Sequence, residues 1–219
     1  PVMTTSRNVV AQTASGDTGN VVVVGAHLDS VRSGPGINDN GSGVAAVLET
    51  ALQLGARPPG DNAVRFAFWG AEEISADGST DYVRSLTGEQ LDDIALYLNF
   101  DMVASPNAGY FTDDGDQSSV TGPQVREVPE GAAGIERTLA GHLNLAGVRP
   151  ADIPLGRNTD YAPFLAAGVP IGGITTGSSQ RKTAVQERIW GGQADVAFDP
   201  NYHTPRDTID NVDREALLI

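Results

Sequence analysis

Acidic and imidazole side chains follow three apolar runs of strand length. The runs span residues 21–25 (VVVVG), 64–70 (VRFAFWG) and 94–102 (IALYLNFDM). The side chains at or near their carboxyl ends are, in chain order, His27, Asp29, Glu72, Glu73 and Asp101. Open α/β sheets bind their ligands in the crevice outside the carboxyl ends of the strands. We therefore expect these side chains to meet in one crevice, where they could bind a cation or exchange protons.

Two further segments carry candidate residues. The loop GPGINDNGSG follows the first run and contains Asp39, and the segment NYHTPRD contains His203. The loop matches neither the G-x-G-x-x-G pattern nor a Walker A sequence, because it has no lysine and has an aspartate where phosphate would lie. A nucleotide site is therefore not expected. The third histidine, His142, lies in a helical pattern and is expected to be an ordinary surface or core residue.

Each of these residues also has an ordinary structural explanation. A pair of glutamates is usually a solvated surface, a histidine after a strand is usually hydrogen-bonded structure, and Asp101 could cap a helix. Their coincidence at three strand ends favours a shared site. Several carboxylates in one crevice repel each other unless cations or protons balance them. Oxygen and imidazole ligands together suit zinc and related divalent metals, so the residues favour a metal site.

Short apolar runs alternate with helical patterns along the chain. A weaker fourth strand is expected at 169–177, and helices are expected at 42–57, 77–86 and 134–147. This alternation is typical of βαβ units and predicts an α/β sandwich. The polar segment 113–134 is expected to be a surface insertion within a single domain that spans residues 1–219.

Composition excludes some classes of function. The 219 residues carry a net charge of −14, and Lys182 is the only lysine. A surface that binds nucleic acid needs clustered cations, so neither nucleic acid nor an anionic membrane is an expected partner. The chain has no cysteine, which rules out disulfides and thiolate metal sites. No apolar run reaches the length of a membrane span, and the N-terminus shows no signal-peptide pattern.

At these residues the sequence resembles a known family. The segments GAHLDSVRSGPGINDNGSGVAAVLETA, RFAFWGAEEISADGSTDYV, YLNFDMVASPNAGYF and GRNTDYAPFLAAGVPIGG are similar to those of the co-catalytic di-zinc aminopeptidases. The similarity extends over nearly the whole chain and is to the bacterial leucyl aminopeptidase type, the group that includes the secreted streptomycete aminopeptidases. It implies a three-layer α/β/α sandwich with a mixed, mainly parallel central sheet, and a secreted, monomeric enzyme. It also implies helices before the first strand and after residue 219, which are not expected within residues 1–219.

The resemblance implies two zinc ions per chain, bridged by Asp39. One ion would be completed by His27 and Asp101, and the other by Glu73 and His203. Such paired metals share a water molecule, lower its pKa and polarise the scissile carbonyl. The resemblance also implies a cis peptide bond between Asp39 and Asn40.

The same resemblance assigns roles around the metals. Glu72 would be the general base, and Asp29 would accept a hydrogen bond from the second ring nitrogen of His27. Tyr202 would stabilise the oxyanion, and Arg157 would contact the substrate. Glu72 and Asp101 are the expected partners of the substrate's free N-terminal amine.

The expected substrates are peptides with apolar N-terminal residues. Ile174, Phe164 and Trp190 could line an apolar pocket that prefers leucine to alanine and disfavours charged residues. Tyr161, where relatives often have histidine, could reshape the pocket wall. Two alternatives remain open: a non-catalytic binding or receptor-like module, and a carboxypeptidase or glutaminyl-cyclase-like enzyme on the same scaffold.

Overall fold

The computed structural model describes residues 5–55, 60–122 and 127–219. These residues form one seven-stranded sheet with the strand order β1-β3-β2-β4-β7-β5-β6. The strands are β1 (Val9–Gln12), β2 (Asp17–His27), β3 (Asn62–Trp69), β4 (Ile94–Phe100), β5 (Phe111–Asp113), β6 (Ala151–Ile153) and β7 (Ile171–Thr175).

The sheet is mixed but mainly parallel, which confirms the expected fold class. β2 pairs in parallel with β3 and β4, β4 with β7, and β5 with β6. β1 and β5 run antiparallel to β3 and β7. The four strands expected from the sequence are β2, β3, β4 and β7. The sequence analysis missed β1, β5 and β6, which have only three or four residues each.

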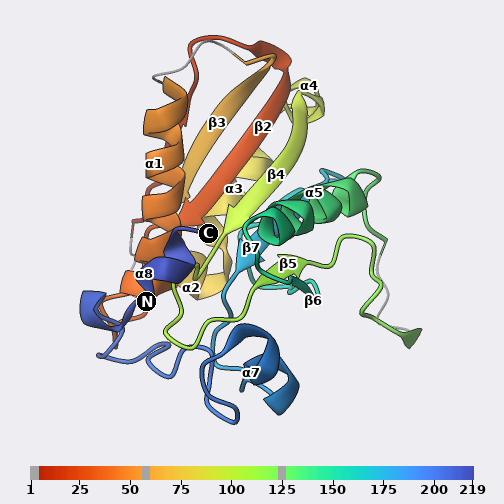
Figure 1. Cartoon of the computed structure of the whole chain (residues 1–219). Helices are drawn as coiled ribbons and strands as arrows, with labels where there is room; N and C mark the ends of the chain where they lie inside the picture. Colours follow the sequence, from red (N-terminus) through yellow and green to blue (C-terminus); the bar gives the residue numbers. More distant parts are fainter. Residues whose placement is uncertain (1–4, 56–59, 123–126) are drawn as a thin grey trace.

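Short helical segments cover both faces of the sheet. They are η1 (Ile37–Ser42), α1 (Gly43–Gly55), α2 (Glu72–Ser75), α3 (Asp77–Ser85), α4 (Gly88–Asp92), α5 (Ala132–Leu145), α6 (Ala162–Ala166), α7 (Ala184–Trp190), η3 (Ile209–Asn211) and α8 (Arg214–Leu217). α1 and α5 lie in front of the sheet and α3 lies behind it (Figure 1), which gives the predicted three layers. The three expected helices are α1, α3 and α5, although positions 56 and 57 lie outside the described residues.

The face of the sheet that α3 covers has the more completely buried core. Trp69, Tyr97 and Phe164 are fully buried there, and the Tyr97 and Phe164 rings stack with centroids 4.2 Å apart. The Trp69 indole nitrogen donates to the Tyr97 hydroxyl, so the buried polar atoms of these rings are paired. This aromatic cluster fixes β3 and β4, the two strands that lead to Glu72 and Asp101.

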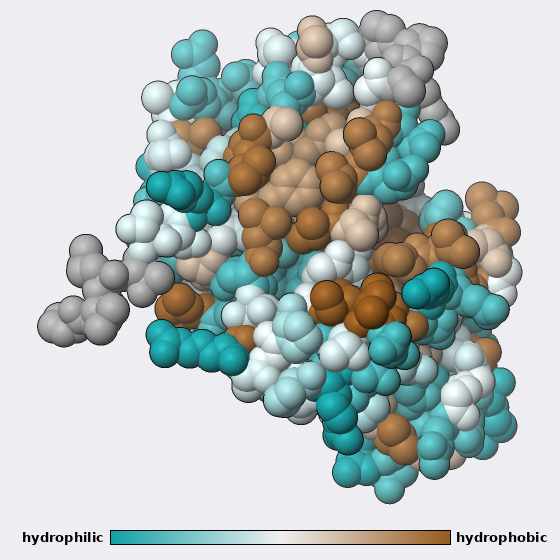
Figure 2. Space-filling model, turned by 90° about the vertical axis from the view of Figure 1, so that its left-hand side faces the viewer, coloured by the Kyte–Doolittle hydropathy of each residue, from teal (hydrophilic) through white to brown (hydrophobic). Residues whose placement is uncertain are grey.

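The opposite face is covered mainly by α1 and is less complete. Val22 and Phe68 are only partly buried there, and α1 exposes Leu48 and Leu52. Hydrophobic residues gather in the upper half of the side on which α1 lies (Figure 2). Among the described residues, no helix has the length and apolar character needed to cross a bilayer.

Both predicted bounds of the insertion, residues 113 and 134, are wrong. Asp113 is the last residue of β5, and α5 begins at Ala132. Positions 123–126 of this segment lie outside the described residues. The interpretation of the intervening residues as a surface insertion within one domain stays a prediction.

Candidate metal centre and active site

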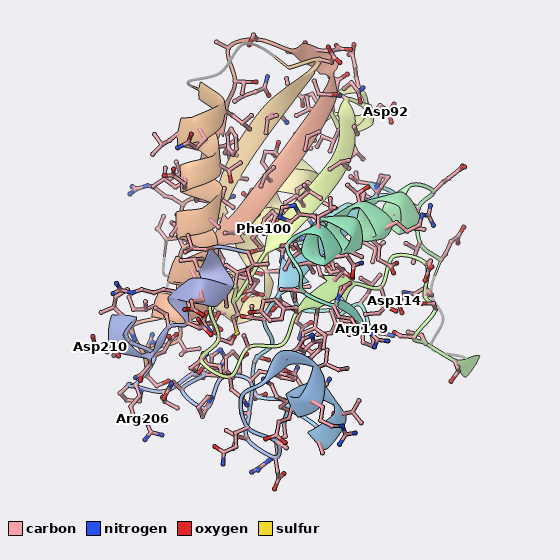
Figure 3. All side chains as sticks on the ribbon, viewed as in Figure 1. Asp92, Phe100, Asp114, Arg149, Arg206 and Asp210 are labelled. Atoms are coloured by element: carbon pink, nitrogen blue, oxygen red, sulfur yellow. The ribbon has the colours of Figure 1, made fainter. Side chains whose placement is uncertain are left out.

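The carboxyl ends of β2, β3 and β4 bring the candidate residues together. His27 ends β2 opposite Trp69 of β3, three residues before Glu72. Phe100 ends β4, directly before Asp101, and Figure 3 shows it at the opposite end of this strand from Asp92. Parallel pairing thus places all three strand ends at one edge, as the sequence predicts.

The five predicted ligands form two groups that share Asp39. The Nε2 atom of His27 lies 3.2 Å from one Asp39 oxygen and 3.4 Å from Asp101 Oδ1. The Nε2 atom of His203 lies 3.1 Å from the other Asp39 oxygen and 3.1 Å from Glu73 Oε2. Each group contains one imidazole and two carboxylates within ligand distance of one another. Asp39 thus presents one carboxylate oxygen to each group.

These donor sets fit zinc. Two ligands at about 2.0–2.1 Å from a tetrahedral ion lie about 3.3 Å apart, close to the distances within both groups. Within the described residues, the Nε2 atoms of both histidines, Glu73 Oε1 and Asp101 Oδ1 are buried without a hydrogen-bond partner. Buried polar atoms without partners are costly in a folded protein. Bound cations would satisfy these atoms and neutralise the carboxylates.

The electrostatics of the site also favour the binding of positive charge. Burial lowers the pKa of His27, but the carboxylates of Asp101 and Asp39 outweigh it and raise the pKa to about 12. Burial, and then the charge of Asp101, raise the pKa of Glu72 to about 9. Burial likewise raises the pKa of Asp39 and Glu73. Crowded carboxylates therefore stabilise any nearby cation.

Asp29 has a different partner from the one the sequence predicts. The His27 Nδ1 atom lies 3.0 Å from the backbone carbonyl of Asp29, whereas its distance to the carboxylate is 3.8 Å. The carboxylate instead accepts the backbone N–H groups of Glu72 at 2.9 Å and Glu73 at 3.2 Å. These N–H groups begin α2 and would otherwise be unpaired, which is why a carboxylate suits this position. Asp29 therefore fixes the segment that carries the glutamate pair.

The loop that carries Asp39 is held from both sides. The Asp207 carboxylate accepts the backbone N–H groups of Asn38 and Asp39, at 2.7 and 3.1 Å. The Asn40 side-chain oxygen accepts the N–H groups of Gly43 and Met102. A side chain at Gly43 would collide with the Phe100 carbonyl, so only glycine allows this approach. The predicted cis peptide bond between Asp39 and Asn40 is confirmed.

Comparison with known proteins identifies the family. Residues 8–218 match the sequence model of peptidase family M28. The chain belongs to this family. It is 59% identical over 217 residues to a probable lipoprotein aminopeptidase, LpqL, of Mycobacterium tuberculosis. The aligned region covers 98% of this chain and 43% of LpqL. It is 47% identical over 216 residues to an aminopeptidase of Pseudomonas aeruginosa, covering 99% of this chain and 39% of that protein.

Solved structures agree with this assignment. BSAP, a zinc aminopeptidase from Bacillus subtilis, superposes with a TM-score of 0.73 at 27% identity, over 96% of this chain and 46% of BSAP. The chain thus spans less than half the length of these relatives. The expected similarity to streptomycete enzymes stays a prediction.

The M28 site opens into a cavity of about 790 Å³. Tyr202 lines the cavity, and its ring stacks on His203 with centroids 3.8 Å apart. Burial, followed by the charge of Asp39, raises the pKa of the Tyr202 phenol, so it remains a proton donor. Arg157 is exposed and does not line the cavity, although its neighbours Gly156 and Asn158 do.

The apolar wall of the cavity differs from the expected one. Ile174 lines it, but Phe164 is fully buried in the core and Trp190 packs against Tyr110 and Phe111. The described apolar residues that line the cavity with Ile174 are Ile74, Met102, Phe111, Ile153, Pro154, Tyr161 and Phe198. The Tyr161 hydroxyl accepts the backbone N–H of Gly156 and so holds one side of the cavity.

Sequence reasoning missed several acidic residues at the site. Asp207 clamps the Asp39 loop, and Asp199 accepts a hydrogen bond from the Asn38 side chain. Asp160 is buried with one oxygen unpaired among the described residues, and burial raises its pKa to about 7. Asp207 follows His203 within NYHTPRD and Asp160 lies in the quoted GRNTDYAPF, so their acidic character was visible. Their contacts depend on tertiary structure. His142 lies outside the site, as expected, with Nε2 against the Ile219 carbonyl.

Proposed function

We propose that the protein is a di-zinc aminopeptidase that removes N-terminal residues from peptides. The observation that carries this proposal is the division of the Asp39 carboxylate between two groups of ligands, each with its own histidine. A site for a single ion would leave one histidine without a function. Membership of family M28 supports peptide hydrolysis, and the comparison with BSAP supports zinc.

Zinc ions in these two groups would lower the pKa of a water molecule and polarise the scissile carbonyl. His27, Asp39 and Asp101 would hold one ion, and Asp39, Glu73 and His203 the other. This arrangement leaves Glu72 free, although its backbone is fixed beside Glu73 by the Asp29 carboxylate. Side chains of the protein carry out the remaining steps of the reaction.

Glu72 acts as the general base in this proposal. Its carboxylate lines the cavity but belongs to neither ligand group. It accepts a proton from the attacking water and delivers it to the leaving amine, so the carboxylate is restored at the end of the cycle. The Tyr202 hydroxyl donates a hydrogen bond to the oxygen on which charge develops.

Selection for the N-terminus comes from negative charge in the cavity. The carboxylates of Glu72 and Asp101 are candidates to hold the protonated amine of the substrate. Arg157 is proposed to contact the substrate from the rim of the cavity, beside Gly156 and Asn158. A peptide whose amine is acetylated would place a neutral amide against these carboxylates without compensating their charge.

The apolar wall supports a preference for leucine over alanine. Met102, Phe111 and Ile174 offer apolar surface within the cavity. Burial of each methylene contributes about 0.8 kcal/mol, and leucine has three more carbons than alanine, so kcat/KM should differ about 50-fold. The wall residues come from three separate strands or strand ends, which gives the preference a rigid basis.

We also propose that the protein acts as a monomer outside the cytoplasm, without nucleic acid or membrane partners. The strong negative charge argues against binding to nucleic acid or to an anionic membrane surface. The description of the M. tuberculosis relative as a lipoprotein supports only the location outside the cytoplasm. Fractionation of cells that express the protein, together with sedimentation analysis, tests both statements. Recovery only from the cytoplasm, or a stable dimer, would contradict them.

The decisive experiment compares leucine 4-nitroanilide with its N-acetylated form. We expect hydrolysis of the free amine and none of the acetylated compound by zinc-loaded protein. The Glu72→Gln variant is the matched control, because it keeps the size of the side chain but removes the base. Equal cleavage of both compounds would overturn the aminopeptidase proposal. Cleavage of neither would favour a non-catalytic binding module.

A further inference from the structure

The cavity contains a buried carboxylate that the proposed mechanism does not use. Asp113, the last residue of β5, is only 8% exposed and lines the cavity. Neither ligand group includes it. An aspartate residue that is more than nine-tenths buried is rare unless a cation or a set of donors compensates its charge. Its surroundings therefore indicate what the cavity is built to receive.

Within the described residues, no hydrogen bond or ion pair reaches the Asp113 carboxylate. Burial, followed by the like charge of Asp101, raises its pKa to about 7. Arg181 is the basic residue among the described lining residues, but its guanidinium is highly exposed and pairs with Asp195. The carboxylate therefore faces the cavity without a compensating charge from the protein.

The position of Asp113 suits the side chain of a bound N-terminal residue. A side-chain carbon at Gly173 of β7 would lie 2.7 Å from Asp113 Oδ2, so the carboxylate lies against the backbone of β7. β7 separates β5 from β4, the strand that leads to Asp101. Two strand spacings amount to about 10 Å. A substrate whose amine lies at Asp101 can therefore reach Asp113 with a long side chain.

We propose that Asp113 binds the side-chain cation of an N-terminal lysine or arginine, and so extends the substrates of the aminopeptidase to basic residues. This inference rests on the proposed function. Lysine combines an apolar four-carbon stem with a terminal ammonium group. The stem would contact Met102, Phe111 and Ile174, and the ammonium group would pair with Asp113. The expectation that charged residues are poor substrates then holds for acidic residues alone.

The test compares lysine with norleucine, which has the same four-carbon stem without the ammonium group. The kcat/KM values of the two 4-nitroanilides are measured for zinc-loaded wild type, Asp113→Asn and Asp152→Asn. Asp152 is the control, because it also lines the cavity but is exposed and accepts a hydrogen bond from Ser118. We expect the lysine-to-norleucine ratio to fall about 30-fold in Asp113→Asn and to change less than threefold in Asp152→Asn.

Three results would overturn the inference. They are an unchanged ratio in Asp113→Asn, an equal fall in Asp152→Asn, and an equal loss for both substrates in Asp113→Asn, which would assign Asp113 to the α-amine. Calorimetric binding of lysine amide and norleucine amide provides a readout that does not need turnover. If no anilide is cleaved, the aminopeptidase proposal fails. Tighter binding of lysine amide that depends on Asp113 would still support the inference, and equal or absent binding of the two amides would refute it.

Discussion

Replacement of Asp29 by alanine tests how the glutamate pair is held. The substitution removes two hydrogen bonds from the Asp29 carboxylate to the N–H groups of Glu72 and Glu73. A hydrogen bond to a charged group contributes about 1.5–3 kcal/mol. The Asp29 side chain is 26% exposed, so we take the low end and expect a loss of about 3 kcal/mol for the pair. For a chain of this size, that lowers the melting temperature by about 6–12 °C.

The same variant should weaken one zinc site and spare the other. The backbone carbonyl of Asp29, which faces His27 Nδ1, is retained in Asp29→Ala. The loss should therefore fall on the ion bound by Glu73, with affinity lowered about 10–100-fold. Zinc titration of Asp29→Ala, Glu73→Ala and the double variant separates the sites. The zinc that remains in Glu73→Ala should bind equally well in the double variant.

Asp92→Ala is the matched control for this experiment. Asp92 is exposed, accepts no hydrogen bond from the described residues, and lies at the other end of the sheet from the site (Figure 3). A melting temperature for Asp29→Ala within 1 °C of that of Asp92→Ala would refute the role of the carboxylate. Weaker zinc binding at the His27 site in Asp29→Ala would instead support the hydrogen bond between His27 and the Asp29 carboxylate that is expected from the sequence.

Two further predictions concern other carboxylates of the cavity. Glu72→Ala should keep both zinc ions and lose at least a thousandfold in kcat, whereas Glu73→Ala should lose one ion. Metal analysis and steady-state kinetics check both variants, and near-normal turnover in Glu72→Ala would exclude Glu72 as the base. The Asp113 carboxyl group has a pKa of about 7 in the folded protein, against an ordinary value of 3.8. Because the folded state holds this proton more tightly, the free energy of unfolding that Asp113 contributes falls as pH rises from about 4 to 7. Asp113→Asn should therefore gain up to about 4 kcal/mol more stability relative to wild type at pH 8 than at pH 4, as measured by urea unfolding; an equal difference at both values would contradict the buried, uncompensated carboxylate.

The central strands and the candidate residues at their ends were predictable from sequence because strong local patterns mark them. Val21 and Val23 are fully buried in the strand that their run predicts. His27, Glu73 and Asp101 lie at or near the strand ends, and parallel pairing then brings them together. The assignment of Asp39 and His203 as ligands came from the resemblance to the family. The short strands β5 and β6 carry no such pattern, since three residues cannot establish an alternation.

The supporting contacts were not predictable, because they join positions far apart in the chain. Asp207 meets Asn38 across 169 positions, and Asn40 meets Phe100 across 60. The contacts of Asp29 were also not predictable from sequence, although its partners lie closer to it in the chain. Its residue type suited either a histidine partner or a helix N-terminus, and only the geometry of α2 decides between them. Phe164 was assigned to the cavity wall because apolar character does not distinguish a core from a pocket.

Calorimetric titration of zinc into metal-free protein tests the central claim most directly. The shared Asp39 carboxylate predicts two zinc ions per chain in the wild type. Asp39→Ala should lower the affinity of both, because each ion would lose a ligand. One ion per chain in the wild type, or an Asp39→Ala variant that still binds two ions with unchanged affinity, would contradict a two-metal centre bridged by Asp39.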